Sequence, residues 1–443
     1  MVTSLLMAAV GVLFASVLSL VPALHVYNVA GLFFLGTAAL DYDMPAEYLA
    51  PFLVGMITGY SLLSTVPSIF LSAPDESSVF MVRPGQTYLL QRRGYEAAVL
   101  SGIGGLGAVG ALALLTPVAP TLLSAIHTIL RPHLHWVLWA VIAYLLLSEW
   151  PKGSGRAPAG WLRWWDGWKS LTAGLVAFLL SGVLGFILLY RTLVPISVAH
   201  QNLLPAFVGL FALPWILQNL LSRVKLPEQY ICRTLDLQPG LIVRGTLAGV
   251  MGGGFAAFFP VVTGGIGGLL AGHATAQRDD RLFLISQGAS KVLYYCGGLL
   301  LLFVPRLHLT RGGMAWMLSS RWSSGQSFNL YNPQTYYLAI AALTFSGFLS
   351  FFALLLTARV AIRLVSAVDY HWISLGTLIV LLIIVLGVTG WGGLLICFVA
   401  TGIGLIPVLW GSRQVNCMGV LLLPLALNMV GSGSHIARWL GFV

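Results

Sequence analysis

Charged residues are scarce in this sequence: Asp, Glu, Lys and Arg make up only 8% of its 443 residues, whereas soluble domains contain about 25%. Hydrophobic residues make up 58% and form long runs along the whole chain, which excludes an ordinary soluble domain. The runs lack the alternation of apolar and polar residues that a membrane β-barrel requires. We therefore predict an all-α, polytopic protein of the cell (plasma) membrane.

Two further features are missing. The four cysteines show no Cys-x-x-Cys spacing, which argues against a zinc or disulfide framework. No Lys or Arg precedes Arg83, whereas a secretory signal peptide needs a positively charged start. We expect the apolar segment that begins at Leu5 to be a retained membrane helix.

The net charge of +10 comes from 23 Lys and Arg against 13 acids, and most of the basic residues stand between apolar runs. This distribution is typical of the cytoplasmic loops of membrane proteins. We therefore expect the lipid bilayer as a partner and no nucleic acid.

The apolar runs predict about 10–14 membrane segments, since a spanning helix needs roughly 20 apolar residues. Proline interrupts two of the runs, Leu5–Leu40 at Pro22 and Leu241–Ala271 at Pro260. Because proline removes a backbone donor and breaks helix interiors, we expect Pro-broken or re-entrant helices at both places.

Two pairs of stretches match in the same order along the chain. Gly11–Pro22 aligns with Gly249–Pro260 through Gly-Val and Pro at equal spacing. Ile69–Met81 aligns with Leu282–Tyr294, where Phe, Leu, Ser and Val coincide. The common order predicts an internal duplication.

The duplication predicts three parts: a first transmembrane repeat over residues 1–226, a cytoplasmic linker over 227–240, and a second transmembrane repeat over 241–443. Counting membrane crossings from the loop charges gives the two repeats opposite orientations. Inverted repeats with broken helices are typical of secondary transporters, which bind substrate near the middle of the bilayer.

The two breaks are the predicted substrate-binding elements, because a helix N-terminus there favours an anion. The residues concerned are Pro22, His25 and Asn28 at the first break and Pro260, Thr263, Gly264 and Gly265 at the second. The alternative left open is a pair of proline kinks with glycines that permit close helix packing.

The stretch "SAPDESS", residues 72–78, places Asp75 and Glu76 between apolar segments. A carboxylate at the bilayer centre costs about 2.5–3.5 kcal/mol on insertion scales, so it would need a partner or a coupling ion. We predict that both acids couple transport to H⁺ or Na⁺. The alternative is an ordinary cytoplasmic turn.

The aligned stretch in the second half, "SQGASKV", contains Lys291 inside an otherwise apolar run. An ammonium there suits an anionic substrate, or an ion pair with Asp75 or Glu76, and the alternative is that it snorkels to the surface. The serines of the two stretches complete the predicted substrate-binding set: Ser72, Ser77, Ser78, Ser286 and Ser290.

The stretch "PSIFLSAPDESSVFMVRPGQTYLLQRRGYEAAVLSGIGG", residues 67–105, resembles the large permease subunit (TctA) of the tripartite tricarboxylate transporters. The stretches "GTLAGVMGGGFAAFFPVVTGG" and "ATGIGLIPVLWGSRQVNCMGVLLLPL" resemble the same family, in its shorter, archaeal-type uncharacterised branch. Ala23 after Pro22, and "FPVVTGG" at the second break, depart from the glycines usual in the family.

This resemblance implies a permease of two related halves that imports carboxylates with H⁺ or Na⁺. It further implies a small membrane subunit and an extracellular binding protein as partners, and it is compatible with a homo-oligomer.

Three functions remain open. The first is secondary transport of an organic anion, and the second is transport or flipping of an amphiphilic anion such as a polyprenyl phosphate. The third is a membrane-embedded enzyme that acts on lipid phosphates through Asp279 and Asp280, which the lack of a neighbouring acid-base partner disfavours. We expect no enzyme, no resident cofactor and no metal site, because His133 and His135 supply only two ligands.

Overall fold

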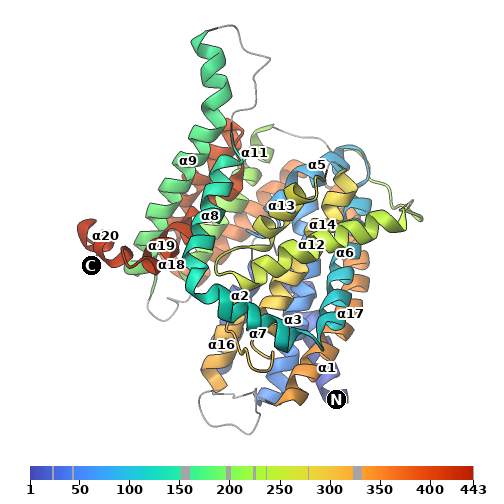
Figure 1. The fold of residues 1–443 in the computed structure, drawn as a ribbon. Helices are drawn as coiled ribbons and strands as arrows, with labels where there is room; N and C mark the ends of the chain where they lie inside the picture. The colour runs from blue at the N-terminus through green and yellow to red at the C-terminus, as the bar shows by residue number, and fades with distance from the viewer. Residues whose placement is uncertain are drawn as a thin grey trace. The chain divides into compact units, whose positions relative to one another are not determined.

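The computed structural model describes residues 1–21, 24–41, 44–150, 160–195, 201–222, 226–235, 237–277, 279–322 and 332–442. Throughout this described part the regular structure is helical, as predicted (Figure 1). The chain divides into two compact units. Unit 1 comprises Met1–Leu130 and Arg223–Ile373, and unit 2 comprises Arg131–Ser222 and Ser374–Val443.

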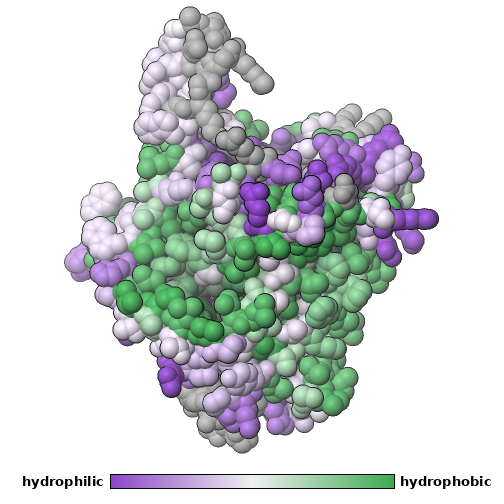
Figure 2. All heavy atoms as spheres, turned by 45° about the vertical axis from the view of Figure 1, so that its right-hand side comes forward, coloured by the Kyte–Doolittle hydropathy of each residue, from purple (hydrophilic) through white to green (hydrophobic). Residues whose placement is uncertain are grey.

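Eight helices of the described chain are long and apolar enough to cross a membrane, or up to nine if the bent pair Gln414–Met429 and Gly433–Trp439 forms one span. These are fewer than the predicted 10–14 segments, because several apolar runs form helices too short to cross. Figure 2 shows hydrophobic side chains over a broad area of the visible face, as expected of a surface that contacts lipid.

Unit 1 is built around the helix α3, which is buried except for Glu47 and Tyr48 in its first turn and packs against α1, α14 and α17. The helices of this unit are α1 (Val2–Leu18), α2 (Val26–Ala39), α3 (Ala46–Leu63), α4 (Thr65–Phe70), η1 (Val79–Met81), α5 (Val82–Leu90), α6 (Gly94–Leu115), α7 (Ala119–Leu130), α12 (Pro239–Phe258), α13 (Gly264–Ala274), α14 (Asp280–Val292), η5 (Leu293–Gly297), α15 (Gly298–Leu300), α16 (Gly312–Trp322) and α17 (Pro333–Ala367). Because α3 is mostly apolar, packing on every side is the arrangement that it favours.

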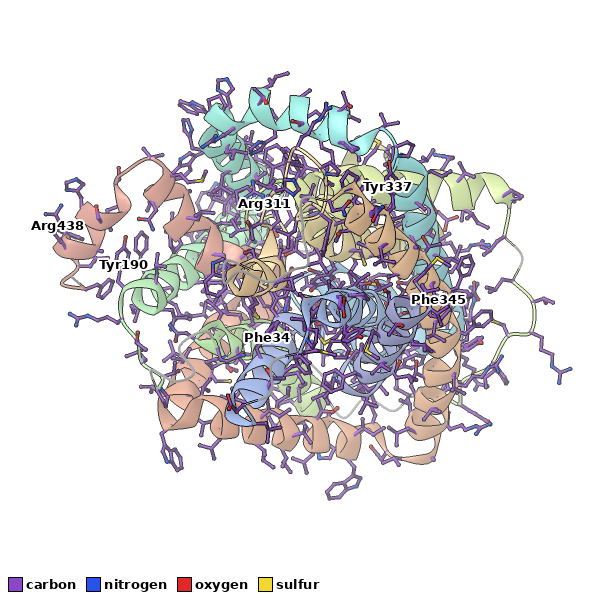
Figure 3. All side chains as sticks on the ribbon, turned by 90° about the horizontal axis from the view of Figure 1, so that it is seen from below. Phe34, Tyr190, Arg311, Tyr337, Phe345 and Arg438 are labelled. Carbon is purple, nitrogen blue, oxygen red and sulfur yellow. The ribbon has the colours of Figure 1, made fainter. Side chains whose placement is uncertain are left out.

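The long helix α17 borders unit 1 on the outside. Its side chains Tyr337 and Phe345 are 56% and 41% exposed (Figure 3), whereas Leu354 on the same helix is buried in the core with Phe70 and Ile285. The helix is therefore apolar on both its inner and its outer face, which suits a helix between a protein core and lipid.

Unit 2 contains the helices η2 (Arg131–His133), α8 (Leu134–Leu147), α9 (Trp161–Tyr190), α10 (Leu203–Phe207), η4 (Val208–Ala212), α11 (Leu213–Ser222), most of α18 (Tyr370–Trp410), η6 (Gln414–Met418), α19 (Gly419–Met429) and α20 (Gly433–Trp439). Within it, α9 packs against α19. Gly390, with φ of +68°, interrupts α18. Elsewhere in the unit, the Glu149 carboxylate accepts a hydrogen bond from the Arg413 backbone N–H at 2.7 Å.

The predicted break at Pro260 is present: α12 ends at Phe258 and α13 begins at Gly264. A corresponding break separates α1 from α2. Pro22, which we predicted to cause it, lies outside the described residues.

The first pair of aligned stretches makes equivalent contacts. A Cβ placed on Gly11 of α1 would collide with the carbonyl oxygen of Phe52 on α3, and one on Gly249 of α12 would collide with that of Ser286 on α14. In each case the backbone nitrogen four residues further along the partner helix is also close, Met56 N at 2.8 Å and Ser290 N at 3.0 Å, although Ala289 Cβ lies closer to Gly249 at 2.5 Å. These equivalent contacts agree with the proposed duplication, which itself stays a prediction.

The second pair of aligned stretches does not correspond in structure. Ile69–Met81 contains the end of α4, an irregular loop and η1, whereas Leu282–Tyr294 is one continuous helix. Four coinciding residue types do not impose the same backbone, so this alignment is wrong.

The compact units also differ from the predicted sequential parts 1–226 and 241–443. Each unit combines one segment from each predicted repeat, and the second segment of unit 1 starts at residue 223, close to the predicted boundary. This interleaving is compatible with two repeats.

Replacing Gly104 by Leu should lower the unfolding temperature in detergent. A Cβ at this position of α6 would collide with the carbonyl oxygen of Ile285 on α14, and overpacking typically costs about 1–3 kcal/mol. Gly110→Leu on the same helix is the control, since no described atom lies within 4 Å of a Cβ there. Equal unfolding temperatures for both variants would contradict this close packing.

Candidate functional site

The acidic stretch is buried inside unit 1. Residues 71–78 form an irregular loop between α4 and η1, in which Asp75 is 7% exposed and Glu76 is 3% exposed. The stretch is therefore a loop buried inside the protein and not a solvated cytoplasmic turn. A buried loop must satisfy its backbone polar groups from within the protein.

The Asp75 carboxylate pairs with some of the backbone N–H groups of this buried loop. Its Oδ1 accepts hydrogen bonds from the backbone N–H groups of Ser77, at 3.1 Å, and Ser78, at 2.8 Å, and from the Ser78 hydroxyl at 2.6 Å. Its Oδ2 accepts hydrogen bonds from the hydroxyls of Tyr60 and Tyr295, both at 2.9 Å. Donors thus occupy both oxygens, which stabilises the charged carboxylate in the interior.

Glu76 is satisfied on one side only. Its Oε1 lies 2.8 Å from His25 Nε2 and 3.3 Å from the Tyr295 hydroxyl. Its Oε2 is buried and has no hydrogen-bond partner among the described residues. Leaving a buried acceptor unpaired costs about 1–3 kcal/mol, so this oxygen is suited to receive a proton or a cation.

Lys291 brings a positive charge to the same region. The residue is 1% exposed, so it does not snorkel. Its Nζ donates to Thr65 Oγ1 at 2.7 Å and to Ser64 Oγ at 3.2 Å, at the junction of α3 and α4. Asp75 attracts it electrostatically.

The direct ion pair predicted between Lys291 and Asp75 or Glu76 is not formed. Within the described part of the chain, Lys291 makes no ion pair with any carboxylate. Donors already occupy both Asp75 oxygens, and the ammonium contacts neutral hydroxyls instead. A buried ammonium in this position lacks a neutralising charge at contact distance.

The second break, at the N-terminus of α13, reaches the same loop. The Thr263 hydroxyl caps α13 and donates to the Glu76 carbonyl at 3.3 Å. The Gly264 carbonyl accepts a hydrogen bond from Ser290 Oγ of α14 at 2.7 Å. A Cβ on Gly265 would lie 3.1 Å from the Glu76 carbonyl oxygen, so a larger residue here would press on the acidic loop.

The remaining predicted residues lie around this cluster with different contacts. Asn28 is 9% exposed in the first turn of α2. The Ser72 hydroxyl contacts the hydroxyl of Tyr370 at 3.2 Å and Gln86 Nε2 at 3.0 Å, so it serves the packing of the loop. The Ser286 hydroxyl is buried and has no hydrogen-bond partner among the residues described.

Sequence reasoning missed several members of the cluster: Tyr60, Ser64, Thr65, Gln287 and Tyr295. One signal could have found some of them. Gln287, Lys291 and Tyr295 follow one another at intervals of four residues in an apolar region, and this spacing puts polar groups on one face of a helix.

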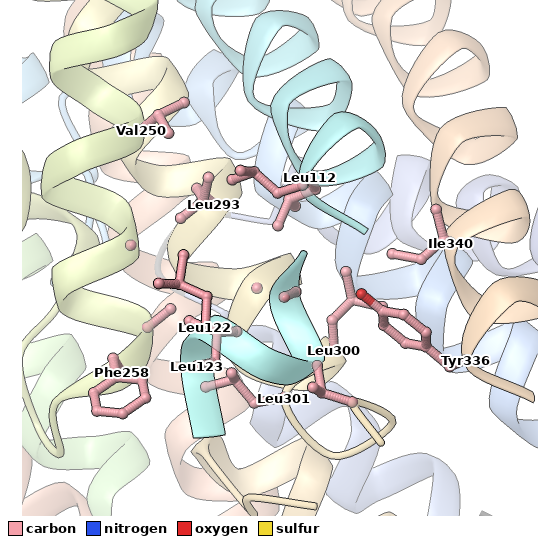
Figure 4. A pocket seen from close by; sticks show the side chains of 16 residues that line it. Leu112, Leu122, Leu123, Val250, Phe258, Leu293, Leu300, Leu301, Tyr336 and Ile340 are labelled. Atoms are coloured by element: carbon pink, nitrogen blue, oxygen red, sulfur yellow. The ribbon is translucent and has the colours of Figure 1, made fainter. Parts of the chain in front are cut away.

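An apolar cavity of about 150 Å³ lies elsewhere in unit 1, between α7, α12, α15 and α17 (Figure 4). Leu293 and Gly297 of η5 line it, whereas Tyr295 between them belongs to the carboxylate cluster. Tyr336 is the one residue of its lining with a polar side chain. The cavity therefore suits a hydrocarbon group and not the charge of an anion.

The acid pair considered for an enzyme has a structural role. Asp279 is the N-cap of α14 and accepts a hydrogen bond from the Arg281 backbone N–H at 2.8 Å. The side chains of Asp279 and Arg281 are exposed, at 47% and 42%. The described residues include no group of three or more His, Cys, Asp and Glu side chains that could hold a metal ion.

Comparison with known proteins places these features in a family. Residues 5–419 match the model of the tripartite tricarboxylate transporter TctA family. The chain is 24% identical over 434 residues to an uncharacterised protein of Methanocaldococcus jannaschii, an alignment that covers 96% of this chain and 98% of that protein. No solved structure matches the chain.

The two carboxylates should contribute unequally to stability. Asp75→Asn should lower the unfolding temperature, because an amide group presents N–H donors to hydroxyls and backbone N–H groups that now donate to a carboxylate. We expect a loss of about 1–3 kcal/mol. Glu76→Gln should cost much less, since one of its oxygens is unpaired among the described residues. Equal losses in thermal unfolding would contradict this assignment.

Proposed function

The chain belongs to the tripartite tricarboxylate transporter TctA family of membrane permeases, and on this premise we propose that it is a secondary transporter of a carboxylate-type organic anion. The transport is driven by H⁺ or Na⁺. The single observation that carries the proposal is the buried Lys291 ammonium, whose hydrogen bonds within the described chain go to the hydroxyl groups of Ser64 and Thr65. An anion that reaches it supplies the missing charge.

The surroundings of Lys291 favour an anion further. The N-terminus of α13, an 11-residue helix, lies beside it: a Cβ on Gly264 would lie 3.0 Å from the Lys291 Cα. A helix N-terminus carries partial positive charge and unpaired N–H groups. The glycines of this turn allow a close approach of backbone and ligand.

The coupling ion acts at the two carboxylates. Asp75, hydrogen-bonded on both oxygens, remains a fixed negative charge that attracts Lys291 without contacting it. Glu76, which faces His25 at 2.8 Å and keeps one oxygen unpaired within the described chain, is the group that gains and loses the ion. An anion and a coupling ion then bind within one connected cluster.

The described conformation is closed around this cluster. Lys291, Asp75 and Glu76 are between 1% and 7% exposed. An organic acid can enter only after the surrounding helices move, as alternating access in secondary transporters requires. The breaks at α12–α13 and α3–α4 are the natural places for such a movement.

The family further suggests accessory proteins. In keeping with a tripartite system, we propose that a small membrane subunit and an extracellular binding protein work with this permease. Co-purification with the products of neighbouring genes would identify them.

Uptake of labelled citrate into proteoliposomes, under an imposed H⁺ or Na⁺ gradient, tests the proposal. Wild-type protein should accumulate citrate with one of the two gradients. Lys291→Met should reduce uptake at least about tenfold, since it removes a buried charge from the binding site. Glu76→Gln should abolish the dependence on the gradient.

Lys169→Met is the matched control, because Lys169 is a partly exposed lysine of unit 2 that pairs with Asp166. It should transport like the wild type. Gradient-driven uptake by Lys291→Met at the wild-type rate would refute the proposed role of the ammonium.

An amphiphilic anion is the second candidate substrate. The observation that favours it is the apolar cavity bordered by η5, the same helical turn that carries Tyr295 (Figure 4). A cavity of about 150 Å³ has room for part of a hydrocarbon chain.

Gly254→Leu separates the two candidates. Gly254 lines the cavity, and the atom nearest to a Cβ there is Leu293 Cδ2 at 3.5 Å, so leucine should fill the space without collision. The variant should reduce uptake of farnesyl phosphate if the substrate is amphiphilic, and should leave citrate uptake unchanged. Unchanged transport of both compounds would remove the cavity from the account.

A further inference from the structure

A polar stripe runs along one face of the continuous helix formed by α14 and η5. Gln287, Lys291 and Tyr295 follow at intervals of four residues, which places their side chains in a row. Tyr295 contacts both carboxylates, and Lys291 contacts the α3–α4 junction. Gln287 is the member of the row to which neither the family nor the proposed function assigns a role.

Gln287 is buried without hydrogen bonds. It is 1% exposed, and neither Nε2 nor Oε1 has a partner among the described residues. A buried amide normally pairs its donors and its acceptor, and leaving them unpaired destabilises the folded state. An unpaired buried group of this kind is expected at functional sites, because these are the places where proteins depart from the rules of a stable core.

The position of the amide is well defined. A Cβ on Gly268 of α13 would lie 2.6 Å from Gln287 Nε2 and 2.8 Å from Oε1. The side chain therefore lies against α13, the helix whose N-terminal residue Thr263 contacts the Glu76 backbone. Lys291 is four residues away on the same helix, and such neighbours lie about 5–6 Å apart at their Cβ atoms.

We propose that Gln287 and Lys291 together form the subsite for a hydroxycarboxylate group of the substrate, an inference that rests on the proposed transport function. Lys291 supplies the positive charge, and Gln287 Nε2 donates to a carboxylate oxygen. Gln287 Oε1 needs a donor, which a carboxylate lacks and a neighbouring hydroxyl group provides. The unpaired donor and the unpaired acceptor of one amide thus match an acid that carries a hydroxyl group beside its carboxylate.

Malate and succinate test this subsite, because they differ by one hydroxyl group. Purified wild-type protein should be stabilised against thermal unfolding by malate at lower concentrations than by succinate. A site built to bind a hydroxyl group rejects the analogue that lacks it, since its polar atoms then stay unpaired.

Gln287→Leu is the decisive variant. Without ligand it should unfold at the wild-type temperature or above, because it removes an unpaired buried amide. Its apparent affinity for malate should fall at least about tenfold, and the preference for malate over succinate should disappear. A residue with a purely structural role would not combine retained stability with lost selectivity.

Gln229→Leu is the matched control in the same unit. Gln229 is 6% exposed, and its amide donates to the Leu89 carbonyl at 2.8 Å and accepts from the Gly94 N–H at 3.1 Å. This variant should lose stability and keep the preference for malate.

The outcomes separate the two levels of the account. The subsite is overturned if Gln287→Leu keeps the preference for malate or unfolds below the wild-type temperature. Equal stabilisation of the wild type by malate and succinate overturns it as well. A wild-type protein that neither these two acids nor citrate stabilises overturns the proposed function, and the subsite falls with it.

Discussion

The burial of charge is the constraint on which the rest of unit 1 depends. Two carboxylates, one ammonium and His25 lie together with exposures between 1% and 7%. Buried charges persist only when hydrogen bonds and opposite charges compensate them. The hydroxyls of Tyr60 and Tyr295, the turn formed by residues 75–78 and the α3–α4 junction provide this compensation, which explains why these elements pack so closely.

The compensation is incomplete in a way that fits a permease. One Glu76 oxygen and the whole Gln287 amide stay unpaired within the described chain, and Lys291 contacts only neutral groups. A protein that needed only a stable core would do better with apolar residues here. The chain belongs to a family of multi-span permeases of the cytoplasmic membrane, and the transport function proposed above gives these groups a role, since in it an anion and its coupling ion satisfy them in turn.

The sequence alone was sufficient for those features that its composition and its apolar runs determine. The all-helical fold, the membrane location and the family resemblance are confirmed, since composition and long apolar runs determine the first two. The break at Pro260 and the charges of Asp75 and Lys291 were visible as interruptions of apolar runs. The roles of Tyr60 and Tyr295 could not be predicted, because the hydrogen-bond partner of a buried tyrosine is determined by the packing of helices that are distant in sequence. The number of membrane segments was predicted only in part, because hydropathy does not tell a short broken helix from a full span.

A double-mutant cycle between Asp75→Asn and Lys291→Met tests the shared buried cluster most directly. The account predicts that the double variant is more stable than the sum of the two single losses in unfolding free energy implies. Each single change leaves the opposite charge buried without its counterpart, and the double change removes both. Residues coupled in this way typically interact by about 0.5–3 kcal/mol. It also predicts that citrate no longer stabilises this double variant. Strictly additive losses, or stabilisation by citrate as strong as in the wild type, would contradict the account.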